Sequence, residues 1–189
     1  MRTCIFVAAA LSLALLMGCR TSPKTAEGKE DLRQAAERAM DRMTAADPGL
    51  QNVVDKAHAH AIFPKVGKGG LIAGGAYGRG IVYEQGRMIG YADLTQATIG
   101  LQAGGQTYSE LIVFQNNDAL DRFRTNQLEF SANASAIAIR TGVAAAPKYE
   151  NGVAVYVMPR AGLMAEASIG GQKFTFVSAD TQAATRPAQ

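Results

Sequence analysis

Four basic side chains lie in or beside glycine-rich stretches in the middle of the sequence: Lys65, Lys68, Arg79 and Arg87. Arg160 and Lys173 occupy similar positions near its end. Backbone N–H groups in glycine turns bind anions, and flanking Lys or Arg side chains add charge-assisted hydrogen bonds. Each basic residue beside an anionic membrane contributes about 1 kcal/mol of binding free energy. The pattern predicts a site for an anion such as a phosphate headgroup; the alternative is scattered, solvating surface charge.

Two glycine-rich stretches share the composition of nucleotide-binding loops but not their spacing. Residues 67–70 read Gly-Lys-Gly-Gly, lack the G-x-x-x-x-G-K-[ST] pattern and follow a predicted helix instead of a strand. Residues 75–80 read G-x-x-G-x-G, the reverse of the dinucleotide-binding order, and lead into a predicted strand. The sequence therefore predicts no nucleotide cofactor.

Residue types that perform catalysis are present, but their spacing does not favour an enzyme. His58 and His60 are the only histidines, and in a predicted helix they point about 200° apart, whereas two ligands of one metal need i, i+4 spacing. No G-x-S-x-G nucleophile motif occurs. Five carboxylates could in number form a catalytic pair: Glu84, Asp93, Glu110, Glu129 and Glu166. Because charged residues are mostly exposed, we expect them to be isolated surface acids. We expect neither an enzyme nor a metal site.

The N-terminus has the layout of a secretory signal. Arg2 precedes an apolar run over residues 5–17 that is too short to span a bilayer. The ending Leu16-Met17-Gly18-Cys19 resembles a bacterial lipobox, in which the cysteine is acylated and becomes the first mature residue. The alternative is ordinary signal-peptidase cleavage, with Cys19 incidental.

Lipidation of Cys19 would fix the location of the protein. Each buried methylene contributes about 0.8 kcal/mol, so two or more acyl chains hold a protein on its membrane. The residue after Cys19 is not Asp, which by resemblance to the known sorting pattern predicts the outer membrane, facing the periplasm or the surface. Cys4 leaves with the signal, so no intrachain disulfide is expected.

Length and composition limit the number of domains and the classes of partner expected for the chain after the signal. About 165 residues after cleavage suit one domain. A formal net charge of +3 and the absence of Trp argue against nucleic-acid binding. We expect a signal peptide at 1–18, a tether at 19–29, one domain at 30–178 and a disordered tail at 179–189.

The predicted elements are two helices followed by short strands. The pattern favours a core-facing helix over 30–46; the alternative, a membrane-surface helix, is disfavoured because its polar face carries both signs of charge. Asp47-Pro48 starts a second helix, which Phe63-Pro64 ends. A third, short helix follows Asn116.

Strands follow from apolar runs bounded by turn residues. They are expected at 70–76, 80–84, 88–92, 98–103, 107–114, 129–139, 153–158, 162–169 and 173–177, with turns at 84–87, 151–152 and 170–171. Glycine in this region is interleaved with apolar residues, which indicates a folded sheet with crowded packing instead of a linker; these residues are Leu71, Ile72, Tyr77, Ile81, Val82 and Tyr83. The predicted fold is α+β, with N-terminal helices packed on a glycine-rich, mainly antiparallel, barrel-like sheet.

Several motifs in order resemble the SYLF-domain family. They are Ile62-Phe63-Pro64-Lys65, the Gly-Gly-x-Tyr-Gly-Arg-Gly run ending at Gly80, residues 99–104, residues 110–114 and Gly162-Leu163-x-Ala165. The resemblance covers about residues 50–177. It implies a module that binds anionic phospholipids such as phosphatidic acid or phosphoinositides, here in a bacterial secreted lipoprotein.

The resemblance also bears on partners. Some family members touch actin, but actin is not expected as a partner in a bacterial envelope. The basic residues in or beside the glycine turns, Lys65, Lys68, Arg79 and Arg87, are the expected lipid contacts. The alternative is a non-catalytic structural or protein-interaction module of the envelope, whose protein partner the sequence does not identify.

Overall fold

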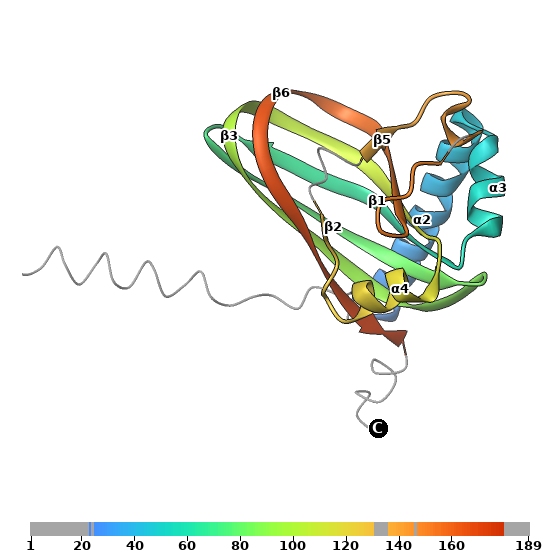
Figure 1. Cartoon of the computed structure of the whole chain (residues 1–189). Coiled ribbons are helices and arrows are strands. Elements are labelled where there is room, and N and C mark those ends of the chain that lie inside the picture. Colours follow the sequence, from blue (N-terminus) through green and yellow to red (C-terminus); the bar gives the residue numbers. More distant parts are fainter. Residues whose placement is uncertain (1–22, 24, 131–135, 146, 180–189) are drawn as a thin grey trace, which may run out of the picture.

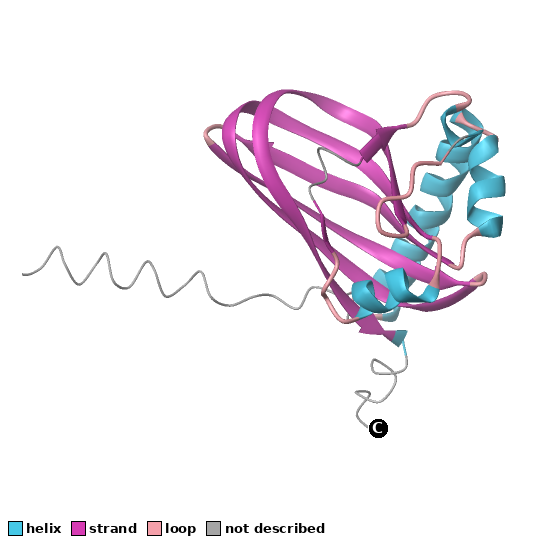
Figure 2. Ribbon diagram, viewed as in Figure 1, coloured by secondary structure: helices cyan, strands magenta, loops and turns pink. Residues whose placement is uncertain are grey.

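The computed structural model describes residue 23 and residues 25–130, 136–145 and 147–179. Within these residues the chain is an α+β fold, in which helices accompany one mostly antiparallel sheet of six strands (Figures 1 and 2). The predicted class and pairing are confirmed. The sheet is open, however, and not barrel-like: β4 (Glu129–Phe130) and β5 (Ala136–Ala138) pair only with β6 (Val153–Ser178) in the described residues.

The first helix, α2 (Ala26–Ala46), is core-facing, as predicted, but begins before Glu30. The earlier start follows from Thr25, whose side-chain oxygen accepts a hydrogen bond from the N–H of Gly28 at 3.1 Å. This bond satisfies one of the unpaired donors at the helix start. On the buried side, Met43 and two alanines pack against the sheet.

The second helix, α3 (Gly49–Lys56), follows Asp47-Pro48 as predicted. The buried carboxylate of Asp47 accepts hydrogen bonds from the N–H of Gly49 at 3.1 Å and from the N–H of Ala144 at 2.7 Å. It therefore joins the helix start to the short 3-10 helix η2 (Val143–Ala145). These backbone hydrogen bonds, above all the one from Ala144, lower the pKa of Asp47.

The predicted extension of this helix to Phe63-Pro64 is wrong, because strand β1 (Ala59–Gly70) occupies that segment. A short apolar run fits a buried strand as well as a helix face, so periodicity alone did not distinguish them. His60 consequently lies in a strand, where its ring stacks on Tyr83 with 5.1 Å between ring centroids.

The central strands are longer than predicted, because glycine does not interrupt them. β2 (Ala73–Glu84) and β3 (Arg87–Phe114) replace five predicted short strands, and β6 runs straight through the predicted turn at 170–171. The turn at 84–87 is confirmed, with positive φ at Gln85 and Gly86. The helix α4 (Asn117–Arg124) is confirmed too, capped by the Asn116 side chain. Of the predicted strand 129–139, only β4 and β5 lie in the described residues.

Strand β3 wraps around the β1–β2 hairpin and curls the sheet. Residues 87–99 of β3 pair with β2, residues 104–114 pair with β1, and β1 and β2 also pair with each other. Positive φ at Gly100 and Gly104 accommodates the bend of β3 between its two halves. Strand β6 follows β3 along nearly its whole length, from Phe114 opposite Val153 to Gly90 opposite Ser178.

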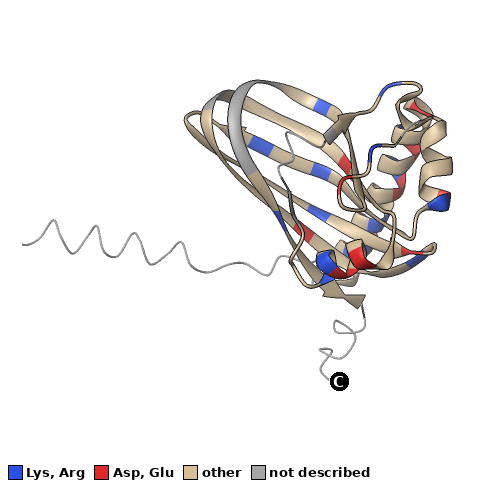
Figure 3. Ribbon diagram, in the orientation of Figure 1, with Lys and Arg blue, Asp and Glu red and all other residues tan. Residues whose placement is uncertain are grey.

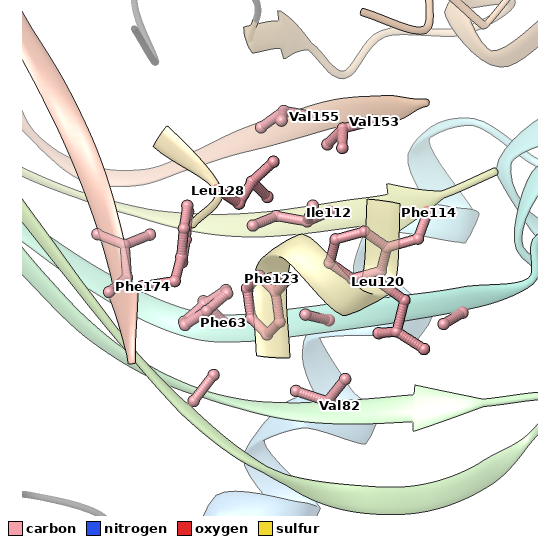
Figure 4. Packing of buried hydrophobic residues seen from close by; sticks show 14 of the residues in the cluster. Phe63, Val82, Ile112, Phe114, Leu120, Phe123, Leu128, Val153, Val155 and Phe174 are labelled. Atoms are coloured by element: carbon pink, nitrogen blue, oxygen red, sulfur yellow. The ribbon is translucent and has the colours of Figure 1, made fainter. Parts of the chain in front are cut away.

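Each face of the sheet has its own hydrophobic core. The face that packs against α2 and α3, here called the α2 face, buries Ile62, Ile81, Leu111, Val113 and Tyr156. The opposite face, here called the α4 face, packs around Leu120 and Phe123 of α4 and includes Phe63, Ile112, Phe114 and Phe174 (Figure 4). Side chains alternate between these two faces along the strands, except at bulges such as the one between Ile62 and Lys65 in β1.

The described cores draw on residues between Leu32 and Phe176. A protein that starts at residue 20 therefore keeps every residue of both cores. None of the helices in the described residues combines the length and the apolar character needed to span a bilayer.

Candidate functional site

Lys65 and Arg79 face each other across β1 and β2 on the α2 face. They are paired residues in the strand register, and both are exposed beyond the area that the helices cover. Arg79 is two positions from the buried Ile81 on the same face, and Lys65 follows a bulge in β1. Neither side chain forms an ion pair within the described part of the chain. Two unpaired cations therefore lie side by side.

Arg79 is held in place by a phenol. Its Nε donates a hydrogen bond to the hydroxyl oxygen of Tyr77 at 3.0 Å, and that hydroxyl donates to Oδ1 of Asp93 at 3.0 Å. Asp93 is the residue opposite Arg79 on β3 and is 8% exposed. The Tyr77 side chain thus orients the guanidinium while keeping it off the carboxylate.

Glycine leaves the surface beside this pair bare. Gly67 lies opposite Tyr77, and a Cβ built on it would meet nothing within 4 Å; the same holds for Gly171 on β6. Both are exposed, so close packing does not explain them. A bound group can approach the backbone closely here.

Lys68 does not belong to this pair. It lies three positions from Lys65, an odd number, so its side chain is on the α4 face with Val66. Only 7% of it is exposed.

Glu110, Gln172 and Gln96 are also buried on the α4 face. Gln172 Nε2 donates a hydrogen bond to Glu110 Oε2 at 3.0 Å. Burial raises the pKa of Glu110 to about 7, opposed by the hydrogen bond from Gln172 and the charge of Lys68. The expectation that Glu110 is a surface acid is therefore wrong. Within the described residues, Glu110 Oε1, Gln172 Oε1 and both amide atoms of Gln96 have no hydrogen-bond partner.

Arg87 is the first residue of β3 and pairs with Glu84, at the end of β2 away from the β1–β2 turn. It lines a pocket of about 460 Å³ together with Met88, Ile89, Arg124 and Phe176. The Arg124 guanidinium pairs with Glu84 Oε2 at 2.8 Å, and His58 Nε2 is 3.2 Å from Glu84 Oε1. The four predicted contacts thus occupy three places, and only Lys65 and Arg79 are neighbours.

No cluster in the described residues brings together three or more His, Cys, Asp or Glu side chains that could hold a metal ion. The predicted lipidation site, Cys19, lies outside the described residues, as does the predicted signal over 1–18.

Sequence reasoning missed an apolar feature at the end of the sheet. Leu71 and Ile72 form the β1–β2 turn and are 70% and 74% exposed, and Ile99 on β3 is 76% exposed. We call these three residues the tip. The expected crowded packing does not hold at Leu71 and Ile72, because a hairpin turn projects its side chains beyond the paired strands. Two large apolar residues at a turn, where polar residues are usual, were the available signal.

Comparison with known proteins shows a resemblance to one family. Residues 95–184 match the Ysc84 family, described as "Las17-binding protein actin regulator", which is the SYLF family. Residues 95–184 therefore resemble the SYLF family. This match begins within β3, after both Lys65 and Arg79.

A curated relative extends the similarity toward the N-terminus. Beta cell expansion factor A from Aeromonas veronii is 27% identical over 157 residues, which cover 81% of this chain and 59% of that protein. The chain thus spans less than two thirds of the length of this relative. Members of the SYLF family are generally binding modules.

Proposed function

We propose that this chain is an envelope lipoprotein, anchored through Cys19 in the outer membrane, whose SYLF domain binds anionic phospholipids. The observation that carries the proposal is the cross-strand pair of Lys65 and Arg79 on an exposed face. The headgroup phosphate lies between these two cations. Lys68 and Arg87 take no part in this site, since one is buried on the other face and the other lines a separate pocket.

The Lys65–Arg79 pair is suited to binding an anion. Like charges directly opposite each other on neighbouring strands destabilise a sheet. Here no carboxylate in the described residues forms an ion pair with either residue, and Tyr77 stands between Arg79 and Asp93. A phosphate accepts hydrogen bonds from both a guanidinium and an ammonium group, and binding it removes the repulsion.

The surroundings favour a membrane over a free phosphate. The bare backbone at Gly67 and Gly171 leaves room for lipid headgroups beside the pair, and Lys173 adds an exposed cation on the same face. Figure 3 shows Lys and Arg on several strands away from the helices. The family supports this proposal, because SYLF domains are associated with lipid binding.

Sedimentation with vesicles tests the proposal. Residues 20–189 are mixed with vesicles of neutral phosphatidylcholine containing increasing phosphatidylglycerol, at about 0.1 M and about 1 M salt, where the Debye length is about 10 Å and about 3 Å. Binding should rise with the anionic fraction and fall with salt. Soluble glycerol 3-phosphate at matched phosphate concentration should compete poorly; equal competition would mean a free-phosphate site.

A charge-reversed pair locates the site. The double variant Lys65→Glu, Arg79→Glu should bind anionic vesicles at least about tenfold more weakly, since each cation near the surface is worth about 1 kcal/mol. The matched control is Arg42→Glu, Lys56→Glu, which changes the net charge equally at exposed positions on α2 and α3. Equal losses in both variants would show that only net charge matters. If the unaltered protein does not bind at low salt, the domain acts instead as a protein-interaction module.

A further inference from the structure

The tip concentrates exposed apolar surface at one end of the molecule. Leu71, Ile72 and Ile99 are the only large aliphatic side chains that are strongly exposed among those that the structure describes. Single exposed apolar residues are ordinary, but adjacent ones in a patch mark a site of interaction. The β1–β2 turn that carries two of them is at the end of the sheet away from the helices (Figure 1).

The tip is also rigid. Leu71 N–H donates a hydrogen bond to the carbonyl oxygen of Ala73 at 3.2 Å, and Gly100 N–H donates to the carbonyl oxygen of Ile72 at 2.9 Å. Ala73 and Ile99 are paired in the strand register. The backbone of the turn is thus fixed to the neighbouring strand, so the tip needs little backbone ordering before it is buried. A preordered wedge loses less entropy on binding than a flexible loop.

The exposed cations of the α2 face lie at defined distances from the tip, measured along the strands. Lys173 and Tyr77 flank Thr95 in one row across the sheet, four positions along β3 from Ile99. At about 3.3 Å per residue this row is about 13 Å from the tip. Arg79 and Lys65 lie one side-chain repeat farther along the same face.

These heights match the layers of a bilayer. Apolar anchors at membrane surfaces penetrate about 5–10 Å, and the headgroup layer on each side is about 5–7 Å thick. A tip at that depth would place Lys173 in the headgroup layer, with Lys65 and Arg79 about 7 Å farther out, so that their long side chains reach the phosphates from above. Along the sheet, the apolar tip comes first and the cations follow. This is the order of the hydrocarbon and the charged headgroups in an anionic membrane.

We propose that the tip inserts into the hydrocarbon of an anionic membrane, so that the domain docks end-on with its helices directed away from the bilayer. The inference rests on the proposed lipid function and adds the part of the site that enters the hydrocarbon. Insertion of apolar side chains is not screened by salt, so a component of vesicle binding should survive at high ionic strength.

The absence of Trp from the sequence permits a direct test. The variant Ile72→Trp of residues 20–189 carries a single indole fluorophore in the tip, and Gln51→Trp on the exposed side of α3 is the matched control. Both are mixed with vesicles of phosphatidylcholine and phosphatidylglycerol, with and without bromine on the acyl chains. Indole emission from the tip variant should shift to shorter wavelength and be quenched by the bromine, whereas emission from the α3 variant should change in neither way.

The possible outcomes distinguish membrane insertion from lipid binding without insertion and from contact with a second copy of the chain. If both proteins sediment with the vesicles but the bromine does not quench the tip fluorophore, the lipid function stands and insertion is wrong. If neither sediments, the lipid function fails as well. A blue shift of the tip fluorophore that depends on protein concentration without vesicles would show that the tip contacts a second copy of the chain instead.

A second variant measures the contribution of the tip without a probe. Ile72→Ser with Ile99→Ser changes two exposed side chains and should leave the thermal midpoint unchanged. Vesicle affinity at high salt should fall by about tenfold or more, because each aliphatic side chain contributes through the apolar area it buries. Unchanged affinity at high salt would overturn the proposal.

Discussion

Gln172 and Glu110 join two distant stretches of the curled sheet, with the amide Nε2 of Gln172 donating to Oε2 of Glu110 at 3.0 Å. Glu110 is in the half of β3 that pairs with β1, whereas Gln172 pairs with Gln96 in the other half. The bond therefore ties together the two halves of the bent strand. Because Glu110 is 1% exposed, its charged form is disfavoured by burial.

The raised pKa of Glu110 predicts a stability that depends on pH. The pKa is about 7 in the folded chain against 4.5 for the ordinary group, so the folded state holds the proton more tightly. Protonated Glu110 contributes on the order of 3 kcal/mol to the free energy of unfolding. This contribution is complete below about pH 4.5 and is lost as the pH rises toward 7. Glu110→Gln, which cannot titrate, should gain stability relative to the unaltered protein as the pH rises from 5 to about 8.

The difference between the two proteins is the quantity to measure. His60, whose pKa burial lowers to about 4, favours the folded state as the pH rises over an overlapping range and would hide the effect in one protein alone. It is present in both, so its contribution cancels. Urea unfolding of both proteins at several pH values gives the difference; a constant value across pH would mean that Glu110 titrates normally.

Two glycines on the β1–β2 hairpin should respond oppositely to the same substitution. A Cβ on Gly80 would lie 2.7 Å from both the carbonyl oxygen of Ile62 and Cδ1 of Phe63, whereas a Cβ on Gly67 would meet nothing within 4 Å. Gly80→Ala should therefore destabilise the fold by about 1–3 kcal/mol through overpacking. Gly67→Ala should be neutral or stabilising by up to about 1 kcal/mol.

Thermal or urea unfolding measures both glycine variants under one condition. Similar losses of stability would show that the hairpin backbone, and not the contact with Phe63, limits the substitution. Gly67→Ala also adds a methyl group to the bare face, so its vesicle binding reports whether close approach to that backbone matters.

Tyr77→Phe should separate orientation from charge at the proposed lipid site. The substitution removes the hydroxyl that links Arg79 to Asp93 but changes no charge. We expect a loss of about 1 kcal/mol in stability, typical of one hydrogen bond, and severalfold weaker binding to anionic vesicles, because the guanidinium is no longer fixed. Tyr83→Phe, on the same strand near the helices, is the control, and equal weakening in both variants would contradict the role of Tyr77.

Local signals predicted the turns at 84–87 and 151–152 and the Asn116 cap, but the turn expected at 170–171 is wrong, because β6 continues through it. The turn at Gln85-Gly86 and the Asn116 cap depend on backbone conformations and hydrogen bonds that a few neighbouring residues determine. The strand boundaries failed, because glycines were interpreted as breaks, whereas β3 passes through Gly100 and Gly104 by bending. Whether a glycine ends a strand or bends it depends on partners far away in the sequence.

The sequence predicted which kind of residue forms the candidate site, but not which of these residues lie together. Strand alternation alone separates Lys65 from Lys68, since they are three positions apart, once that segment is known to be a strand. The pairing of Lys65 with Arg79 required the register of the hairpin, which includes a bulge. The burial of Glu110 required the curl of the sheet, which no short stretch of sequence encodes.

The pairing of β3 with β6 has a consequence for how the chain reaches its native state. Its first pair, Phe114 with Val153, and its last, Gly90 with Ser178, both join residues that are far apart in the sequence. Domains dominated by such contacts fold slowly, because loop closure must precede the gain from pairing. Until β6 has emerged during synthesis, one side of β3 has no partner strand, and that side is fully paired only once Ser178 is available.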